Sequence, residues 1–325
     1  MTLFSPSTKN IIPKLKMSEK IHIFYTINDN YACLLGVSLL SLIENAKSPI
    51  EVHVLFENLS RENRERIKAL ETESAHIDFF NMSTFLNLPE LLSAAFFSPV
   101  TFYRLFIPQL FPDVKRGIYL DSDTVIVGDI TGLYNTDLQG NFFGAVQDYS
   151  IHDFTTILDY SLTACGIPYE NYINSGVLLI DFELLREHEF DRKLMAILKE
   201  KCSLIAPDQE ILNFMALNHI LYLSPEWNLM PSPYTPKVAE PKIVHYNLKA
   251  KPWHYEVECG EYFWKYALRS AFYGEIMTEQ REFKNNPDAE IQESSFVDAM
   301  SAAAARYAKL PGFVAKMNEG KIERL

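Results

Sequence analysis

The chain has 325 residues with a formal net charge of −12, 48% hydrophobic residues and 22% charged residues. This size and composition allow one large globular domain with an appendage, or two domains, and a core that needs no disulfides for support. The acidic balance disfavours a nucleic-acid partner, and no apolar stretch in the sequence is long enough to span a bilayer.

The first part of the chain alternates between strand-like and helix-like segments. Residues 1–20 lack periodicity and are expected to form a flexible leader. Short apolar runs predict buried strands at 21–25, 51–56 and 77–80. Helical spacing of apolar residues, or a polar helix start, predicts helices at 31–44 and 60–72. This alternation indicates an α/β fold with a mostly parallel sheet and helices on both faces.

The second part of the chain continues the alternation. Residues 99–110 predict a helix that carries Arg104, and residues 182–201 predict another helix. A further helix begins at Pro207, with Asp208 expected to cap it. Apolar runs predict additional strands within 117–127, 142–146, 172–181, 221–223 and 242–245.

The composition changes after residue 258, where aromatic residues become dense and small and charged residues follow. We therefore predict a main domain at 21–258 and a helical appendage at 259–325. The aromatic residues of the appendage suggest a weak peripheral contact with a membrane, since the segment has no basic excess. Four widely spaced cysteines indicate reduced thiols, so the expected location is cytoplasmic, with any membrane contact at the inner face.

The most informative stretch is 117–127, where Asp121 and Asp123 interrupt an apolar run. In a strand the two carboxylates would point to the same face, because side chains alternate with a period of two. A buried strand does not hold two unpaired carboxylates, so this end of the strand is expected to reach a crevice that contains a cation. Ligands of open α/β sheets bind at the carboxyl ends of the strands.

Three interpretations of the Asp-Ser-Asp stretch compete. It is a strand followed by a solvated turn, the Asp-x-Asp motif of a haloacid-dehalogenase-type phosphatase, or the Asp-x-Asp motif of a nucleotide-sugar glycosyltransferase. The phosphatase interpretation requires the motif near the start of the domain and an acidic pair downstream. Here three predicted strands precede the motif and no adjacent acidic pair follows it, so the phosphatase interpretation fits poorly.

The order of the polar motifs favours the glycosyltransferase interpretation. These motifs lie at 26–31, 101–105, 119–125, 174–179, 208–213 and 245–253. In this order they resemble the family-8 glycosyltransferases, which include bacterial lipopolysaccharide galactosyl- and glucosyltransferases and glycogenin. The resemblance covers about residues 21–258. It implies a Rossmann-like GT-A fold and retaining transfer of galactose or glucose from a UDP-sugar, with Mn²⁺ or alternatively Mg²⁺, to a saccharide or glycolipid acceptor in cell-surface glycan or lipopolysaccharide synthesis.

The resemblance also assigns roles to individual residues. It implies that Asp121, Asp123 and His245 bind the metal, and the imidazole favours Mn²⁺ over Mg²⁺. The residues implied to bind the rest of the donor are Thr26, Asn28, Asn30, Tyr31, Arg104, Ser122 and Lys251. The residues implied to surround the transferred sugar and the acceptor are Asp148, Asn174, Asp208 and Gln209.

Several of these residues also have a structural interpretation. Tyr31 either stacks on the uracil or packs on the core at a helix start, and His245 either binds the metal or is a buried core histidine. Arg104 either faces the donor or forms a surface ion pair, and Lys251 either contacts the diphosphate as a point charge or is a solvated surface lysine. One departure from the family concerns Leu248, because the family often has glycine there, where the backbone lies close to the diphosphate.

Two questions stay open at this point. Retention of configuration requires either a protein nucleophile under the anomeric carbon or same-face attack assisted by the leaving phosphate. Gln209 is a poor nucleophile, so same-face attack is preferred. The alternative to an enzyme is a non-catalytic UDP-sugar-binding or stress-related protein of the same fold.

Overall fold

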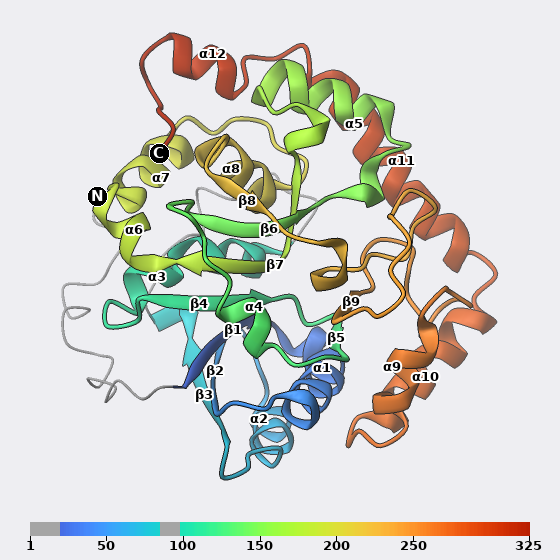
Figure 1. Ribbon diagram of the computed structural model, residues 1–325. Helices are drawn as coiled ribbons and strands as arrows, with labels where there is room; N and C mark the ends of the chain where they lie inside the picture. Colours follow the sequence, from blue (N-terminus) through green and yellow to red (C-terminus); the bar gives the residue numbers. More distant parts are fainter. Residues whose placement is uncertain (1–19, 85–97) are drawn as a thin grey trace.

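A computed structural model describes residues 20–84 and 98–325 (Figure 1). Residues 1–19, most of the predicted leader, lie outside this range. Seven strands of the described residues form one sheet. In spatial order they are β3 (Ala75–Asn81), β2 (Ile50–Phe56), β1 (Ile21–Ile27), β4 (Arg116–Leu120), β7 (Ile173–Asp181), β6 (Phe143–Gln147) and β8 (Ile220–Tyr222). A separate pair consists of β5 (Thr124–Ile126) and β9 (Ile243–His245).

The sheet is mostly parallel, as the sequence predicted. Within the described residues, four neighbouring pairs are parallel: β1–β2, β2–β3, β1–β4 and β6–β8. Strand β7 is antiparallel to both of its neighbours, β4 and β6. The start of β7 therefore lies at the edge where β1 and β4 end, and this edge collects the polar motifs.

Helices cover both faces of the sheet because the strands are apolar on both sides. Ile23 and Tyr25 of β1 belong to one core, and Phe24 between them belongs to the other. The helices that contribute to the first core include α1 (Ala32–Asn45), α2 (Arg61–Lys68), α9 (Gly260–Ala267) and α10 (Tyr273–Asn285). Those of the second core include α3 (Ile107–Leu110), α6 (Phe182–Glu187), α7 (Phe190–Lys199) and α8 (Pro207–Met215).

The chain after residue 258 is helical, as predicted, and it packs closely on the main domain. Phe272 lies against Gly36 of α1, and the hydroxyl of Tyr266 accepts a 2.7 Å hydrogen bond from Asn45. Helix α11 (Ala289–Tyr307) packs along α5 (Thr155–Tyr160), and α12 (Phe313–Asn318) packs on the π-helical segment 161–165 (Figure 1). The division at 258 into a domain and an independent appendage stays a prediction.

Three details differ from the sequence-based expectations. The helix predicted at 182–201 is two helices, because Glu189 adopts a positive φ of 57° between them. The segment predicted as an α-helix at 99–110 begins as a 3-10 helix over Pro99–Phe106. Asp208 does not cap α8, because it lies inside the first turn. The Glu210 side chain instead accepts the N–H groups of Ile205 and Ala206.

Candidate active site

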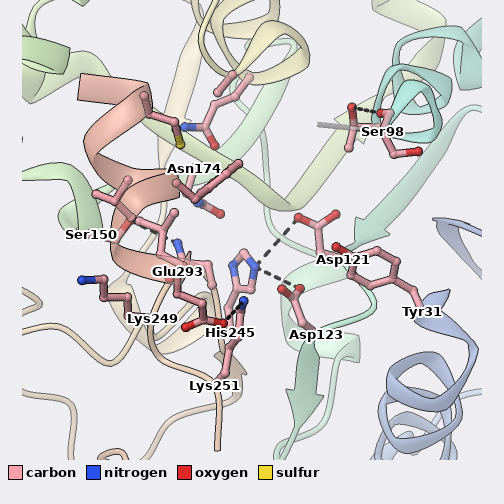
Figure 2. A pocket seen from close by; sticks show the side chains of 18 of the residues that line it. Tyr31, Ser98, Asp121, Asp123, Ser150, Asn174, His245, Lys249, Lys251 and Glu293 are labelled. Carbon is pink, nitrogen blue, oxygen red and sulfur yellow. Dashed lines mark hydrogen bonds and ion pairs between the residues drawn. The ribbon is translucent and has the colours of Figure 1, made fainter. Parts of the chain in front are cut away.

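A cavity of about 800 Å³ opens at the polar edge of the sheet (Figure 2). Its wall includes predicted site residues from every motif: Thr26, Asn28, Tyr31, Arg104, Asp121, Ser122, Asp123, Asp148, Asn174, Asp208, Gln209, His245 and Lys251. Asn30 is the predicted site residue that does not line it; its backbone N–H donates to the Asn28 side chain at 3.1 Å. A volume of this size is typical of small-molecule sites.

The metal-ligand group forms because two strands pair in a fixed register. Asp121 and Asp123 lie in the turn between β4 and β5, and β9 pairs with β5 so that His245 is opposite Thr124. Nε2 of His245 lies 3.2 Å from Asp123 Oδ1 and 3.9 Å from Asp121 Oδ2 (Figure 2). His245 is buried, whereas both carboxylates are about a quarter exposed to the cavity.

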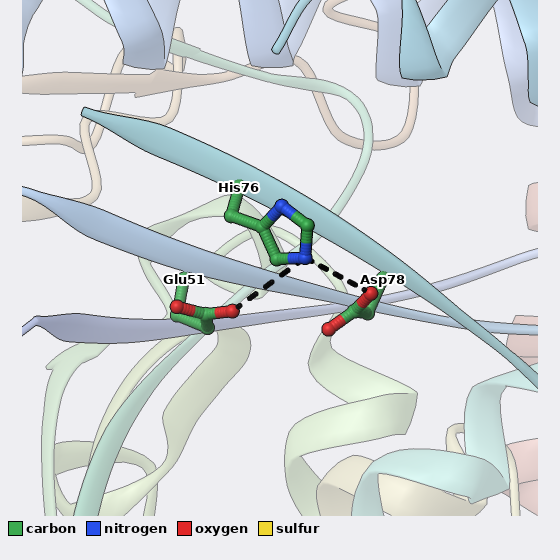
Figure 3. A group of neighbouring side chains, drawn as sticks. All are labelled: Glu51, His76 and Asp78. Atoms are coloured by element: carbon green, nitrogen blue, oxygen red, sulfur yellow. Dashed lines mark ion pairs between the residues drawn. The ribbon is translucent and has the colours of Figure 1, made fainter. Parts of the chain in front are cut away.

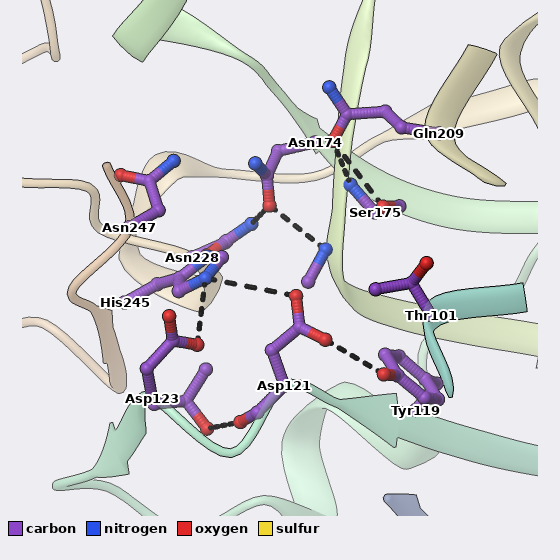
Figure 4. A network of polar contacts seen from close by, with 12 residues as sticks. Thr101, Tyr119, Asp121, Asp123, Asn174, Ser175, Gln209, Asn228, His245 and Asn247 are labelled. Carbon is purple, nitrogen blue, oxygen red and sulfur yellow. Dashed lines mark hydrogen bonds and ion pairs between the residues drawn. The ribbon is translucent and has the colours of Figure 1, made fainter. Parts of the chain in front are cut away.

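A buried amide orients the imidazole of this group. Asn228 Oδ1 lies 3.1 Å from His245 Nδ1, and Asn228 Nδ2 donates to Asn174 Oδ1 at 2.9 Å (Figure 4). With the amide oxygen facing it, Nδ1 carries the proton, so the lone pair of Nε2 faces Asp121 and Asp123. This is the usual outer contact of a metal-binding histidine. No motif in the sequence marks Asn228.

Burial lowers the pKa of His245, but Asp123 and Asp121 outweigh this effect, so its pKa lies above the ordinary value. Two carboxylates that attract a proton to one imidazole would equally attract a cation. Their oxygens and the imidazole nitrogen form a donor set that suits Mn²⁺ better than Mg²⁺. The residues present therefore fit a divalent metal.

The second oxygen of Asp121 is held from the other side. Asp121 Oδ1 accepts a hydrogen bond from the Tyr119 hydroxyl at 2.7 Å (Figure 4). It also accepts a hydrogen bond from Arg104 Nη2 at 2.9 Å. The Tyr119 hydroxyl is also 2.9 Å from Thr26 Oγ1. These contacts direct Oδ2 of Asp121 toward His245. Tyr119 precedes Asp121 by two residues on the same face of β4, which is the sequence signal that could have identified it.

Arg104 lies between two carboxylates. Its Nε is 3.1 Å from Asp208 Oδ2, its Nη2 binds Asp121, and its guanidinium carbon lies 4.4 Å from the centre of the Tyr119 ring. Burial opposes the charge, but Asp121 and Asp208 more than offset it, so the pKa of Arg104 is raised. Burial also raises the pKa of Asp208, with Arg104 acting against it. Arg104 thus links the metal group to the start of α8.

The residues predicted around the transferred sugar do meet in the structure. Asp148 Oδ2 accepts from Asn174 Nδ2 and from Gln209 Nε2, both at 3.1 Å. Gln209 Oε1 in turn accepts the backbone N–H of Ser175 at 2.9 Å (Figure 4). Asp208, one residue before Gln209, lies 3.4 Å from Ser175 Oγ. Four side chains from three chain segments therefore form one polar wall.

Gly176 is a further residue of the site that the sequence analysis did not identify. A Cβ at this position would lie 2.8 Å from Asp121 Oδ2 and would collide with the His245 ring. Only glycine leaves room for these two ligands to approach each other across β7. Its place beside Asn174 in the 174–179 motif is the available sequence signal.

The nucleotide loop and the segment after His245 form the rims of the cavity. Tyr31 is 46% exposed, so it does not pack into the core and its ring is available to a ligand. Leu248 has a positive φ of 50°, the left-handed backbone conformation that favours glycine. Lys251 Nζ forms a 2.9 Å ion pair with Glu293 of α11 (Figure 2).

A second group of metal-ligand side chains lies at the opposite edge of the sheet, at the starts of β2 and β3 (Figure 3). His76 Nε2 is 4.0 Å from Glu51 and 3.3 Å from Asp78. Glu51 also pairs with Lys20 at 2.7 Å, and His76 Nδ1 with Glu71 at 2.6 Å. Each of these side chains contacts another of them, and none of the predicted site residues belongs to the group, so we interpret it as an ion-pair network.

Across residues 20–84 and 98–325, no helix combines the length and the apolar character needed to cross a membrane. All four cysteines are free thiols.

The chain is similar to a known protein family and to several known proteins. The family model described as "Glycosyl transferase family 8" matches residues 22–257. The chain is 28% identical over 264 residues to General stress protein A of Bacillus subtilis (strain 168), covering 74% of this chain and 90% of that protein. It is 24% identical over 261 residues to lipopolysaccharide 1,2-glucosyltransferase of Escherichia coli (strain K12), covering 75% of each. The structure of the galactosyltransferase LgtC in complex with donor and acceptor sugar analogues matches with a TM-score of 0.61 and 26% identity, covering 77% of this chain and 96% of that chain.

Proposed function

Because this chain belongs to glycosyl transferase family 8, we propose that it transfers galactose or glucose from a UDP-sugar to a saccharide or glycolipid acceptor with retention of configuration. Its GT-A-like fold, shared with LgtC, supports a donor site at the polar edge of the sheet, because ligands of open α/β sheets bind at the carboxyl ends of the strands. The observation that carries the proposal is the group formed by Asp121, Asp123 and His245, which lines the same cavity as Asp148 and Gln209.

Asp121, Asp123 and His245 would hold Mn²⁺, with Mg²⁺ as the alternative ion. When bound, the metal supplies positive charge that stabilises the diphosphate leaving group. Asn228 keeps Nε2 of His245 directed at the ligand position. Arg104 and Lys251 line the same cavity, and, although each is paired with carboxylates in this structure, they would place positive charge near a negatively charged leaving group.

The loop at 26–31 would bind the nucleoside. Tyr31 offers an exposed ring on which uracil can stack, and Thr26 and Asn28 line the wall beside it. Ser122 lines the cavity between the two metal-binding carboxylates, and Asn30 supports the loop through Asn28. Purine bases are larger and present different edges, so we expect UDP to bind more tightly than ADP or GDP.

The polar wall supports same-face attack assisted by the leaving phosphate. The Gln209 amide is neutral and donates to Asp148 while it accepts from Ser175. The carboxylate of Asp208 is already paired with Arg104. Neither group is free to act as a nucleophile, whereas both can orient the transferring sugar. Asp148 and Asn174 would lie toward the acceptor.

The similarity to a lipopolysaccharide glucosyltransferase supports a cell-surface glycan or lipopolysaccharide as the product. The four free thiols support a cytoplasmic location. A weak contact with the inner membrane face would fall to Tyr262 and Trp264 of α9, because Phe263 and Tyr266 are buried. A second candidate is a non-catalytic UDP-sugar-binding or stress-related protein of the same fold, and the similarity to General stress protein A supports the stress-related role. Family membership leaves the phosphatase interpretation of Asp121 and Asp123 without support.

The test is a mass-spectrometric screen of UDP-sugars incubated with the protein and Mn²⁺. Release of UDP and hexose from UDP-galactose or UDP-glucose is expected, and it should stop in Asp123→Asn, which keeps the volume of the ligand and removes its charge. An unchanged melting temperature of the variant shows that it is folded. UDP binding without turnover would favour the non-catalytic candidate, and full activity of Asp123→Asn would contradict the metal assignment.

A further inference from the structure

Three hydrogen-bond donors from one short segment converge on a single carboxylate of α11. Glu293 Oε1 lies 2.9 Å from Lys251 Nζ and 3.0 Å from His254 Nδ1, and Glu293 Oε2 accepts from the Tyr255 hydroxyl at 2.8 Å. Figure 2 shows the Lys251–Glu293 pair in the cavity, in the same view as His245. The Glu293 side chain is 18% exposed. An ammonium, an imidazole and a phenol that meet at one point form an anion-binding site.

The imidazole of this site is held in place by α10. His254 Nε2 lies 3.1 Å from Glu279 Oε1, and its ring stacks on Phe283 with 3.9 Å between centroids. Lys251 sits on a loop that also contains the left-handed Leu248. His254 is thus positioned by its own surroundings as well as by Glu293, so it is expected to stay in place when the carboxylate leaves.

Glu293 and the three donors that surround it come from different parts of the chain. Lys251, His254 and Tyr255 lie inside the region 22–257 that the family model matches, whereas Glu293 lies beyond it. Lys251, His254 and Glu293 all line the cavity that contains the metal-ligand group. The cavity therefore holds an internal anion that the matched part of the chain does not supply.

We propose that Lys251, His254 and Tyr255 bind a phosphate group of the donor, and that Glu293 occupies this site when no donor is bound. This inference rests on the proposed function, which supplies a nucleoside diphosphate as the ligand. A diphosphate carries more negative charge and more acceptor oxygens than one carboxylate, so it displaces Glu293 and releases the contact between α11 and the loop. Glu293 thereby lowers donor affinity and makes donor binding depend on this exchange.

The test compares Glu293→Gln with Glu290→Gln by calorimetry of UDP binding in the presence of Mn²⁺. Glu290 is exposed on the same helix, and it acts on Tyr255 only through its charge, so its variant removes one nearby charge while the contacts of Glu293 with the site stay intact. Glu293→Gln should bind UDP about fivefold more tightly than the wild type, a change expected for loss of one partly exposed ion pair. Glu290→Gln should bind UDP as the wild type does.

Two further measurements distinguish competition between Glu293 and the donor phosphate from a purely structural role of Glu293 in holding α11. Uridine, which has no phosphate, should bind equally to the wild type and to Glu293→Gln. In a Lys251→Met background, the gain from Glu293→Gln should shrink or vanish, because the shared site is already damaged. Unchanged or weaker UDP binding by Glu293→Gln, or an equal gain for uridine, would overturn the inference. If the wild type and all variants fail to bind UDP, the proposed function itself fails.

Discussion

The amide oxygen of Asn228 lies 3.1 Å from Nδ1 of His245, while Nε2 of the same ring faces Asp123 at 3.2 Å. One buried amide therefore selects the tautomer of the imidazole and the direction of its lone pair. A metal held by Asp121, Asp123 and His245 would depend on this contact as well as on its three ligands.

Replacing Asn228 with leucine should lower Mn²⁺ affinity by roughly 10–100-fold, the usual effect of losing an outer contact of a metal-binding histidine. Leucine has a similar volume but accepts no hydrogen bond, so the imidazole loses its orientation. Calorimetric titration with Mn²⁺ measures the change. Asn228→Asp keeps an acceptor for Nδ1 and should retain more affinity than Asn228→Leu; equal affinities of wild type and Asn228→Leu would disprove the orienting role.

Gly176→Ala should remove metal binding while the sheet stays folded. The added methyl group would lie 2.8 Å from Asp121 Oδ2 and would push the His245 ring aside. The stabilisation of the protein by Mn²⁺, measured as a rise in melting temperature, should disappear in this variant. Gly274→Ala is the matched control, since a Cβ there meets nothing within 4 Å. A normal Mn²⁺-induced rise in Gly176→Ala would show that the ligands do not approach as described.

Glu210 should make stability depend on pH. It is buried at the start of α8, and burial raises its pKa from 4.5 to about 7, although the N–H groups of Ala206 and Ile205 and the Tyr160 hydroxyl act against this. A folded-state pKa above the unfolded one means that the folded protein binds more protons between these values. Its stability therefore falls as the pH rises from 4.5 to 7, by about 3 kcal/mol in total.

Urea unfolding at pH 5 and pH 8 tests this expectation. The wild type should lose more free energy of unfolding between the two pH values than Glu210→Gln, which cannot titrate. Glu183→Gln, an exposed position in the first turn of α6, should keep the wild-type difference. A Glu210→Gln variant with the wild-type pH dependence would refute the assignment.

Leu248→Gly should stabilise the loop after His245. A left-handed backbone conformation destabilises a residue that has a Cβ by about 1 kcal/mol, and glycine removes this strain. Glycine also has more conformational freedom in the unfolded chain, which cancels part of this stabilisation. The smaller residue also lets the backbone approach the diphosphate, so UDP should bind more tightly. Asn218→Gly, at another exposed position with positive φ, should leave UDP binding unchanged. Weaker UDP binding by Leu248→Gly would contradict this account.

The sequence by itself determined the family, the α/β fold and the three side chains proposed to hold a metal. Apolar runs define strands because buried strands exclude polar groups, and Asp121 and Asp123 stand out against this background. The order of the motifs then placed His245 with them, and the structure brings the three side chains together. These features depend on local pattern and on order along the chain, both of which are visible without coordinates.

Only the tertiary structure shows that β7 is antiparallel to its neighbours, that Asn228 orients His245, and that Glu293 contacts the donors around Lys251. Strand direction depends on pairing across the sheet, and no local pattern in 173–181 specifies it. Asn228 gains its role because it is buried between His245 and Asn174, and Asp208 does not cap α8 because the helix begins before it, at Pro207. Glu293 reaches Lys251 only because α11 folds back over the cavity. Such contacts join residues distant in the sequence, so they follow from the packing of whole elements.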